Sequence, residues 1–483
     1  MSMCAGLAGN QQRGQAIQIG ALLLFTILLI SLSSFQLFVV PDQNAEIEFK
    51  HSQQIRNQLV DYRSAVIRAS SGGGTQAVSV SLAPSYPSRA LFLNPAPPSG
   101  TLQSVGTSDS DIAAAFENVR ALDPEAREYW NGTVHRFGTG ALEYRPGYNY
   151  YGTAPTVAYE NTVLYSRFGD APDSVLNGTG QLLVNGRRIS LVALQGDYQR
   201  SGQETVSVSA FPSSASEERI AVTNSSGERV TVTIPTRLPA EQWNRLLTSQ
   251  FNPNAELCGT ADTTSGTLPD EGRYVDACTY SEGDAPGEFA ALELRFERGV
   301  TYELKLSKVT FGENEVADFG YITQEDGFEN RINEGGSLQI VARTHDEFGN
   351  PASGVPLTAA VTSSTGALGT ITPADTVTGD EGRARFVYDP ADDDNDQDGN
   401  VKDETVTVTI CRGAGGDCST ATPTEKFSVN FTVVDDDTGQ GAGGGDDPGQ
   451  GRGPQSIAVA PEQHEATRPA GRLIAPRAAP DTQ

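Results

Sequence analysis

The sequence predicts a mainly β protein that carries one long helix near its N-terminus. Three observations lead to this fold class. No residue in the run 16–40 is charged, and apolar residues then recur at helical spacing up to Ala69. From Gln76 onward the apolar period changes to two, which is typical of half-buried strands. We therefore expect a transmembrane and stalk helix, a β-rich ectodomain, a β-sandwich and a disordered C-terminal tail at 435–483.

The uncharged run is long enough to cross a membrane. A helix needs about 20 residues to span a hydrocarbon core of roughly 30 Å. A secretory signal has a shorter apolar region and a small-residue cleavage site, and no such site follows Phe35. Arg13 precedes the run and acidic residues follow it from Asp42, so the positive-inside rule places the N-terminus in the cytoplasm. We predict a single-pass membrane protein whose bulk is extracellular.

The helix should continue outside the membrane as an amphipathic stalk. Ile55, Leu59, Tyr62 and Val66 are spaced to form one apolar stripe on a helix. A run of glycines ending at Gly74 should stop that helix. The predicted segments are thus a transmembrane helix at 15–41 and a stalk helix with a glycine hinge at 42–74.

The region 75–325 is predicted to be a β-rich extracellular domain. Asn185 and Gly186 predict a two-residue hairpin turn, and Pro239 predicts the start of a short helix. A cluster of tyrosines could stack on sugars, but core packing is the interpretation we favour. Its members are Tyr144, Tyr148, Tyr150, Tyr151, Tyr159 and Tyr165.

The net charge of −27 excludes a nucleic-acid partner, because contacts to phosphates need a basic face. The acidic residues are spread along the whole chain, which favours a halophilic organism, since concentrated salt screens their repulsion. An acidic protein from an ordinary habitat is the alternative.

Four of the five cysteines lie beyond the predicted span, in two pairs that are close in sequence. We predict the disulfides Cys258–Cys278 and Cys411–Cys418, with four buried thiols as the alternative. Neither pair has the spacing of a zinc site. The fifth cysteine, Cys4, should lie on the cytoplasmic side.

Arg13, Gly14 and Gln15 stand directly before the uncharged helix. This arrangement resembles the class III signal of archaeal type IV pilins and archaellins. The resemblance implies cleavage after Gly14, loss of the leader 1–14, and a mature chain that keeps the apolar helix. The fifth mature position is Ile19, where many pilins have Glu. More broadly, residues 13–310 resemble haloarchaeal surface proteins with such a stem and a β-rich ectodomain.

Residues 326–434 form a series of short alternating strands separated by Gly, Asn and Pro turns, a pattern that predicts a sandwich. The turn with Asp346, Gly349, Asn350 and Pro351 resembles that of a bacterial immunoglobulin-like domain, group one, of the invasin and intimin type. In that family such domains are usually spacers, so the resemblance implies architecture more than chemistry.

One acidic loop has candidate metal ligands. Asp394, Asp396 and Asp398 are spaced like the first half of a calcium-binding loop, but Glu404 falls one residue before the position of the last EF-hand ligand. A calcium site and a solvated acidic loop are the two interpretations; we expect no other cofactor. Four sequons could carry glycans: Asn131, Asn177, Asn224 and Asn430.

The sequence has no enzyme signature, and its only GxGxxG, at 439–444, lies in the low-complexity tail. We therefore expect a membrane-anchored, cell-surface structural or adhesion protein and no enzymatic activity. Its partners would be membrane lipid, through the N-terminal helix, and surface proteins or glycans. The alternatives are an extracellular polysaccharide-acting enzyme in the middle domain, marked by carboxylates in a tyrosine-lined groove, and a true pilus-like filament subunit.

Overall fold

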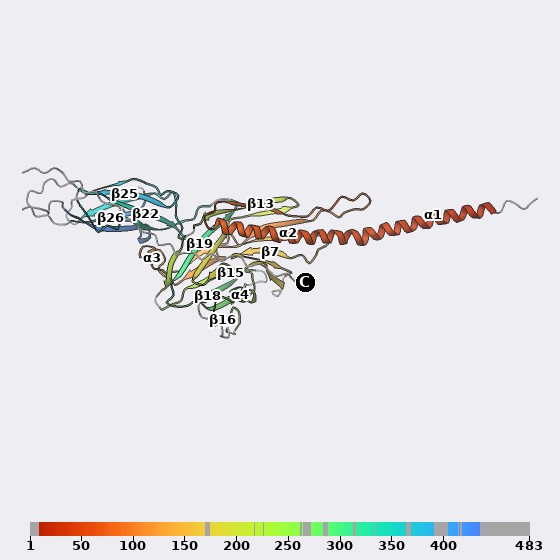
Figure 1. The fold of residues 1–483 in the computed structure, drawn as a ribbon, viewed down its shortest axis with the longest axis horizontal. Helices are drawn as coiled ribbons and strands as arrows, with labels where there is room; N and C mark the ends of the chain where they lie inside the picture. The colour runs from red at the N-terminus through yellow and green to blue at the C-terminus, as the bar shows by residue number, and fades with distance from the viewer. Residues whose placement is uncertain are drawn as a thin grey trace, which may run out of the picture. The chain divides into compact units, whose positions relative to one another are not determined.

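A computed structural model gives the fold of the chain (Figure 1). It describes residues 9–169, 174–216, 218–225, 227–260, 263, 272–283, 288–312, 315–333, 335–363, 369–390, 404–413, 415 and 418–434. Strands dominate these residues, so the predicted mainly β fold class is confirmed. The predicted disordered tail, 435–483, lies outside the described residues.

The N-terminal part is one continuous helix in three segments: α1 (Gly9–Ser34), the π-helical turn η1 (Phe35–Val39) and α2 (Val40–Ala69) (Figure 1). The π turn has a local cause. Pro41 has no N–H to bond to the preceding turn, and the backbone widens just before it, so that the Val40 N–H bonds to the Phe35 carbonyl.

The middle region contains three sheets. The first has the strand order β1-β13-β19-β11-β10, with β14 on β19 and β4 on β14. Its strands are β1 (Gln76–Ser81), β13 (Thr205–Ser214), β19 (Tyr302–Phe311), β11 (Arg188–Gln195), β10 (Val184–Asn185), β14 (Ile220–Asn224) and β4 (Val119–Ala121). The predicted hairpin joins β10 to β11, but Asn185 pairs with Arg188, so the two turn residues are Gly186 and Arg187.

The second sheet has the order β12-β2-β6-β7-β8-β9, and the third has the order β16-β17-β18-β15-β3-β5. The second contains β12 (Gln199–Gly202), β2 (Ser99–Val105), β6 (Ala141–Gly147), β7 (Thr156–Glu160), β8 (Val163–Arg167) and β9 (Val175–Asn177). The third contains β16 (Phe251–Glu256), β17 (Val275–Ser281), β18 (Ala290–Phe296), β15 (Thr231–Thr236), β3 (Ala113–Glu117) and β5 (His135–Gly138). Two short helices, α3 (Ala126–Tyr129) and α4 (Ala240–Leu247), flank these sheets, and Pro239 is the N-cap of α4.

The parallel pair β11 and β19 lies at the centre of the middle region, buried on both faces. Leu191 and Leu304 belong to one apolar core, whereas Leu194 and Val309 belong to another. Successive strand residues point to opposite faces, so the two strands separate the two cores.

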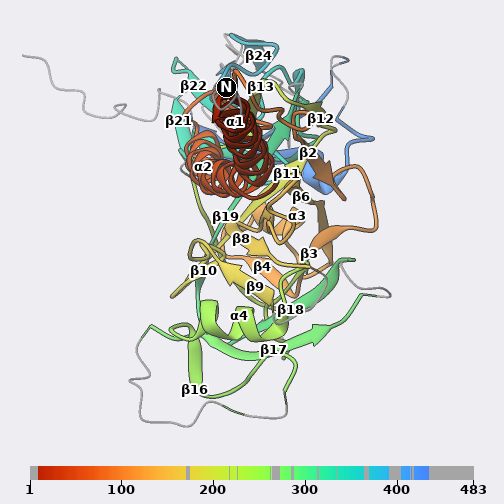
Figure 2. The ribbon, with the colours of Figure 1, turned by 90° about the vertical axis from the view of Figure 1, so that its right-hand side faces the viewer.

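Helix α2 closes the second of these cores. Ile55, Leu59, Tyr62 and Val66 have no exposed surface and pack with residues of β1, β7 and β13. The predicted apolar stripe is therefore correct, and strands of the same chain cover it. Figure 2 shows the helix alongside this part of the middle region. The middle region and the end of the N-terminal helix share one core.

Residues 319–434 form a two-sheet β-sandwich. One sheet has the order β20-β22-β25-β24, the other β21-β27-β26-β23. The first contains β20 (Phe319–Asp326), β22 (Leu338–Asp346), β25 (Arg383–Asp389) and β24 (Thr370–Pro373); the second contains β21 (Arg331–Asn333), β27 (Lys426–Val434), β26 (Glu404–Arg412) and β23 (Leu357–Ser363). A short 3-10 helix, η3 (Pro423–Glu425), precedes β27. A third apolar core fills the sandwich. The first strand of the sandwich begins at Phe319, seven residues before the predicted start of the domain.

Candidate membrane anchor

The first half of the long helix exposes a continuous apolar surface. Its large side chains are 47–73% exposed; they are Ile17, Ile19, Leu22, Leu23, Leu24, Phe25, Ile27, Leu28, Leu29 and Ile30. The continuous helix 17–69 is long and apolar enough to cross a membrane, and only 6% of its most apolar window is buried. The core helix of a soluble protein would be mostly buried. Large exposed apolar surfaces of this kind mark sites of contact with a membrane or another protein.

Glu48 fixes α2 to the middle region. Its carboxylate is fully buried and accepts hydrogen bonds from the backbone N–H groups of Asn149 (2.8 Å), Tyr150 (2.8 Å) and Tyr151 (2.7 Å). The Tyr86 hydroxyl donates a further bond. Charge-assisted bonds of this type are stronger than neutral ones, so the helix is held to this loop by a fully satisfied carboxylate.

One turn further along the helix, His51 makes a second polar contact with the middle region. Its Nε2 lies 3.0 Å from the Ser81 carbonyl oxygen, which can only accept, so Nε2 carries the proton and Nδ1 accepts from the Tyr148 hydroxyl at 2.6 Å. Burial lowers the pKa of His51, although the bond to Ser81 opposes this. The neutral ring is thus the form that fits this contact.

A third contact comes from the clamp loop, which we define as residues 82–98 between β1 and β2. Arg89 donates hydrogen bonds to Gln43 (2.6 Å), to the buried Asn44 (3.2 Å) and to Asn94 (3.1 Å). These bonds hold the loop against the start of α2. No sequence motif marks Glu48, His51 or Arg89. The one signal is a set of three polar residues, Asn44, Glu48 and His51, at spacings of four and three on a single helix face.

The middle region also buries a cluster of ion pairs. Glu143 on β6 and Glu160 on β7 are fully buried, and Arg237, just after β15, lies 2.8 Å and 3.8 Å from them. Burial alone would raise the pKa of Glu143, but Arg237 and Arg145 outweigh it and hold that pKa below its ordinary value. Glu160 also accepts bonds from Thr236 and from the Arg237 backbone, each at 2.7 Å. The two carboxylates are thus buried inside the fold and paired with arginine, and they do not line an open groove.

A turn of the sandwich is inserted into the middle region. Phe348 is 1% exposed and belongs to the apolar core of the middle region, with its ring centroid 4.7 Å from that of Phe137. Asn350 donates to the Ser214 hydroxyl at 2.7 Å and to the Leu306 carbonyl at 2.8 Å. At Gly349 the φ angle is +81°, and a Cβ atom would lie 2.3 Å from Ile220. The sandwich is therefore packed into its neighbour and not joined to it by a flexible link.

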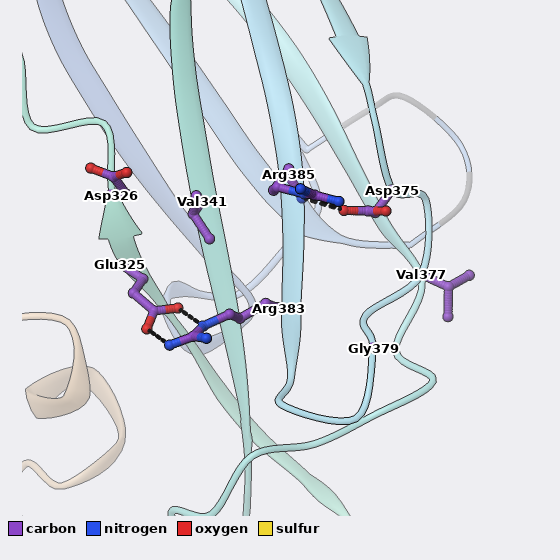
Figure 3. Close-up of a pocket in the computed structure, with 8 residues that line it drawn as sticks. All are labelled: Glu325, Asp326, Val341, Asp375, Val377, Gly379, Arg383 and Arg385. Carbon is purple, nitrogen blue, oxygen red and sulfur yellow. Dashed lines mark hydrogen bonds and ion pairs between the residues drawn. The ribbon is translucent and has the colours of Figure 1, made fainter.

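One groove on the sandwich has a volume of about 610 Å³ (Figure 3). It is lined by Glu325, Asp326, Val341, Asp375, Val377, Gly379, Arg383 and Arg385. Arg383 forms an ion pair with Glu325, and Arg385 with Asp375 at 3.1 Å. Both arginines are thus already neutralised by carboxylates of the same surface.

Both predicted disulfides, Cys258–Cys278 and Cys411–Cys418, are present. Replacing both Cys258 and Cys278 by alanine should lower the free energy of unfolding by about 3 kcal/mol, since the bond closes a loop of about 20 residues. The same change at Cys411 and Cys418 should cost about 2 kcal/mol because that loop is shorter. Thermal unfolding of the two variants checks this order. A larger loss for the second pair would contradict it.

The other predicted site residues are placed as follows. Asp394, Asp396 and Asp398 lie outside the described residues, so the calcium site stays a prediction; Glu404 is the first residue of β26. Arg13, Gly14 and Gln15 lie in the helical backbone of α1. Asn131 and Asn177 are on or beside strands, and Asn224 and Asn430 are strand residues.

The tyrosine cluster divides into two groups. Tyr144, Tyr159 and Tyr165 are buried in the cores, as expected for packing. Tyr148, Tyr150 and Tyr151 instead belong to the loop that contacts Glu48 and His51.

No family model matches the chain, and no curated protein matches it. Among solved structures, domains 4 and 5 of the S-layer protein SbsC are 15% identical, with a TM-score of 0.17, covering 29% of this chain and 63% of that one. The structure of rSbsC(31-844) is 11% identical, with a TM-score of 0.19, covering 75% and 45%. The chain therefore spans less than two thirds of the length of each of these solved structures. TM-scores this low carry no argument, so the functional assignment rests on the residues of the chain itself.

Proposed function

We propose that this chain is a membrane-anchored, cell-surface structural or adhesion protein. The observation that carries the proposal is the single helix 9–69, whose first half is apolar and exposed and whose second half is buried in the ectodomain core. A helix with these two halves joins a bilayer to a folded domain without an intervening linker.

The charges around the helix support an outward orientation. Arg13 precedes the apolar run, and Asp42 and Glu46 follow it, so the N-terminus would be cytoplasmic and residues from 42 onward extracellular. Two disulfides fit an oxidising compartment. In this arrangement the sandwich is, among the described sheets, the one furthest in sequence from the anchor, and a surface protein or glycan could bind it there. The proposal includes no reaction.

Arginine in the middle of the apolar helix should release the protein from membranes. Each arginine at the centre of a spanning helix costs about 2.5–3.5 kcal/mol on insertion scales. We expect the wild-type protein to float with liposomes after an alkaline carbonate wash, and a variant with both Leu24→Arg and Leu28→Arg to stay at the bottom of the gradient.

The matched control places arginine at exposed apolar positions of the sandwich. Phe328 is 63% exposed and Val377 48% exposed, so Phe328→Arg with Val377→Arg should leave flotation unchanged. Flotation of the Leu24 and Leu28 variant at the wild-type level would refute the anchoring role.

A filament subunit is the second candidate, because the same exposed apolar helix could be covered by helices of other copies. The resemblance of Arg13, Gly14 and Gln15 to a class III signal favours it. Electron microscopy of surface material that contains the protein separates the candidates. Filaments that contain the chain would favour the subunit, whereas protein found only as dispersed molecules in membranes would favour the anchor.

A further inference from the structure

The tip of the clamp loop lies beside the last turn of the apolar run. The ring of Phe92 stacks on that of Phe35, with centroids 4.5 Å apart. The Gln36 side chain donates to the Leu93 carbonyl at 2.9 Å and accepts from the Leu93 N–H at 3.0 Å. The loop therefore folds back along the helix. The side chains of Phe35, Gln36 and Phe92 fix it there.

This tip exposes apolar side chains on a loop that is otherwise bound to the protein. Leu91 and Leu93 are 80% and 82% exposed. On the neighbouring helix Leu37 and Phe38 are 67% and 62% exposed. Together these four residues continue the apolar surface of α1 onto a second segment of the chain.

The polar groups at the tip are arranged as a lipid environment requires. A backbone N–H or carbonyl group without a partner is costly in hydrocarbon. At Leu93 both backbone groups are satisfied by the Gln36 amide, and the same two bonds satisfy that amide. A polar residue at the end of the apolar run is thus paired with the loop.

Polar and apolar residues of the clamp loop contact the helix at different distances from the middle of the apolar run. Arg89 bonds to Gln43 and Asn44, seven and eight residues beyond Gln36. At a rise of about 1.5 Å per residue, this places the arginine about 10 Å further from the middle of the span than the Leu93 contact. The guanidinium would then lie among lipid headgroups and the leucines among the acyl chains.

We propose that Leu91, Phe92 and Leu93 insert into the outer leaflet beside the helix. There they form a second membrane contact, in which their side chains pack against lipid acyl chains. This inference rests on the proposed anchoring function and adds a site to it. A second contact beside the helix would restrict rotation and tilt of the ectodomain on the membrane, which a single helix does not do.

The test uses full-length protein in phosphatidylcholine liposomes, with Cys4 replaced by serine and one new cysteine carrying an environment-sensitive fluorophore. The label is placed by Leu91→Cys in the tip, Leu24→Cys in the helix, or Val377→Cys in the sandwich. All three side chains are exposed, so the substitutions leave the cores intact. Quenching is measured with two lipid preparations, one brominated near the glycerol end of the acyl chains and one near their methyl end.

We expect strong quenching at positions 24 and 91 and none at position 377. Quenching at 24 without quenching at 91 would overturn the inference and leave the anchor intact. Absence of quenching at both positions would overturn the inference and the anchoring proposal together. Efficient disulfide cross-linking between unlabelled Leu91→Cys copies would show that a second copy covers the tip instead of lipid, which also overturns the inference.

Discussion

Replacing Arg237 by methionine should lower the free energy of unfolding by about 3–5 kcal/mol at neutral pH. The arginine is 2% exposed and lies between the fully buried carboxylates of Glu143 and Glu160. Methionine keeps most of the volume but removes the charge, so two buried anions lose the cation they share. The loss is measured by denaturant unfolding of the full chain against wild type.

Arg245 provides the matched control for this variant. It pairs with Glu241 one helical turn away, and both side chains are more than 60% exposed. Exposed pairs of this kind contribute little, so Arg245→Met should change stability by less than about 0.5 kcal/mol. A loss at position 237 no larger than at position 245 would contradict the assigned role of the buried cluster.

The Arg237→Met variant should also show a characteristic pH dependence. In the wild-type protein the pKa of Glu143 is held below its ordinary value of 4.5, so its contribution to stability is present above that pH and is lost as pH falls through the lower folded pKa. Without Arg237, burial should raise the folded pKa of Glu143. The deficit of the variant should therefore be largest at neutral pH and shrink in acid.

A Phe348→Ala variant should lose about 3–5 kcal/mol and should loosen the attachment of the sandwich to the middle region. Phe348 lies in a turn of the sandwich but belongs to the core of the middle region. Removing the ring leaves a cavity next to Phe137, where the two parts of the chain meet.

Two readouts distinguish loss of docking from general unfolding. We expect limited proteolysis of the variant to release an intact sandwich under conditions where the wild-type protein stays whole, and the unfolding curve to separate into two transitions. Phe328→Ala is the control, because Phe328 is also on the sandwich but is 63% exposed. Equal protease resistance of the Phe348 variant and wild type would show that the inserted turn does not hold the two parts together.

The sequence predicts the elements well because their signals are local. The apolar stripe of Ile55, Leu59, Tyr62 and Val66 follows from helical spacing alone, and the turn at Gly349 follows from residues that tolerate positive φ angles. The local sequence does not show in the same way which elements pack against one another. A stripe shows that a helix has a face to bury, but not that strands of the same chain cover it.

The residues missed in the candidate anchor depend on contacts between distant parts of the chain. Glu48 is bound by backbone groups about a hundred positions away, and Gln36 by Leu93. Glu143 and Arg237 lie at positions that an alternating strand pattern would otherwise assign to solvent or to loops. Charged residues are usually exposed, and only the packing of two sheets shows that these are not.

If one helix anchors an extracellular domain, a single thiol on the sandwich should be accessible from outside intact cells. A Val377→Cys variant carrying Cys4→Ser would be treated with a membrane-impermeant maleimide before and after cell lysis. The position is exposed on the sandwich, and the remaining cysteines are in disulfides. We predict equal labelling in intact and lysed cells, with the protein in the membrane fraction. Labelling that requires lysis would place the sandwich inside the cell and refute the proposed orientation.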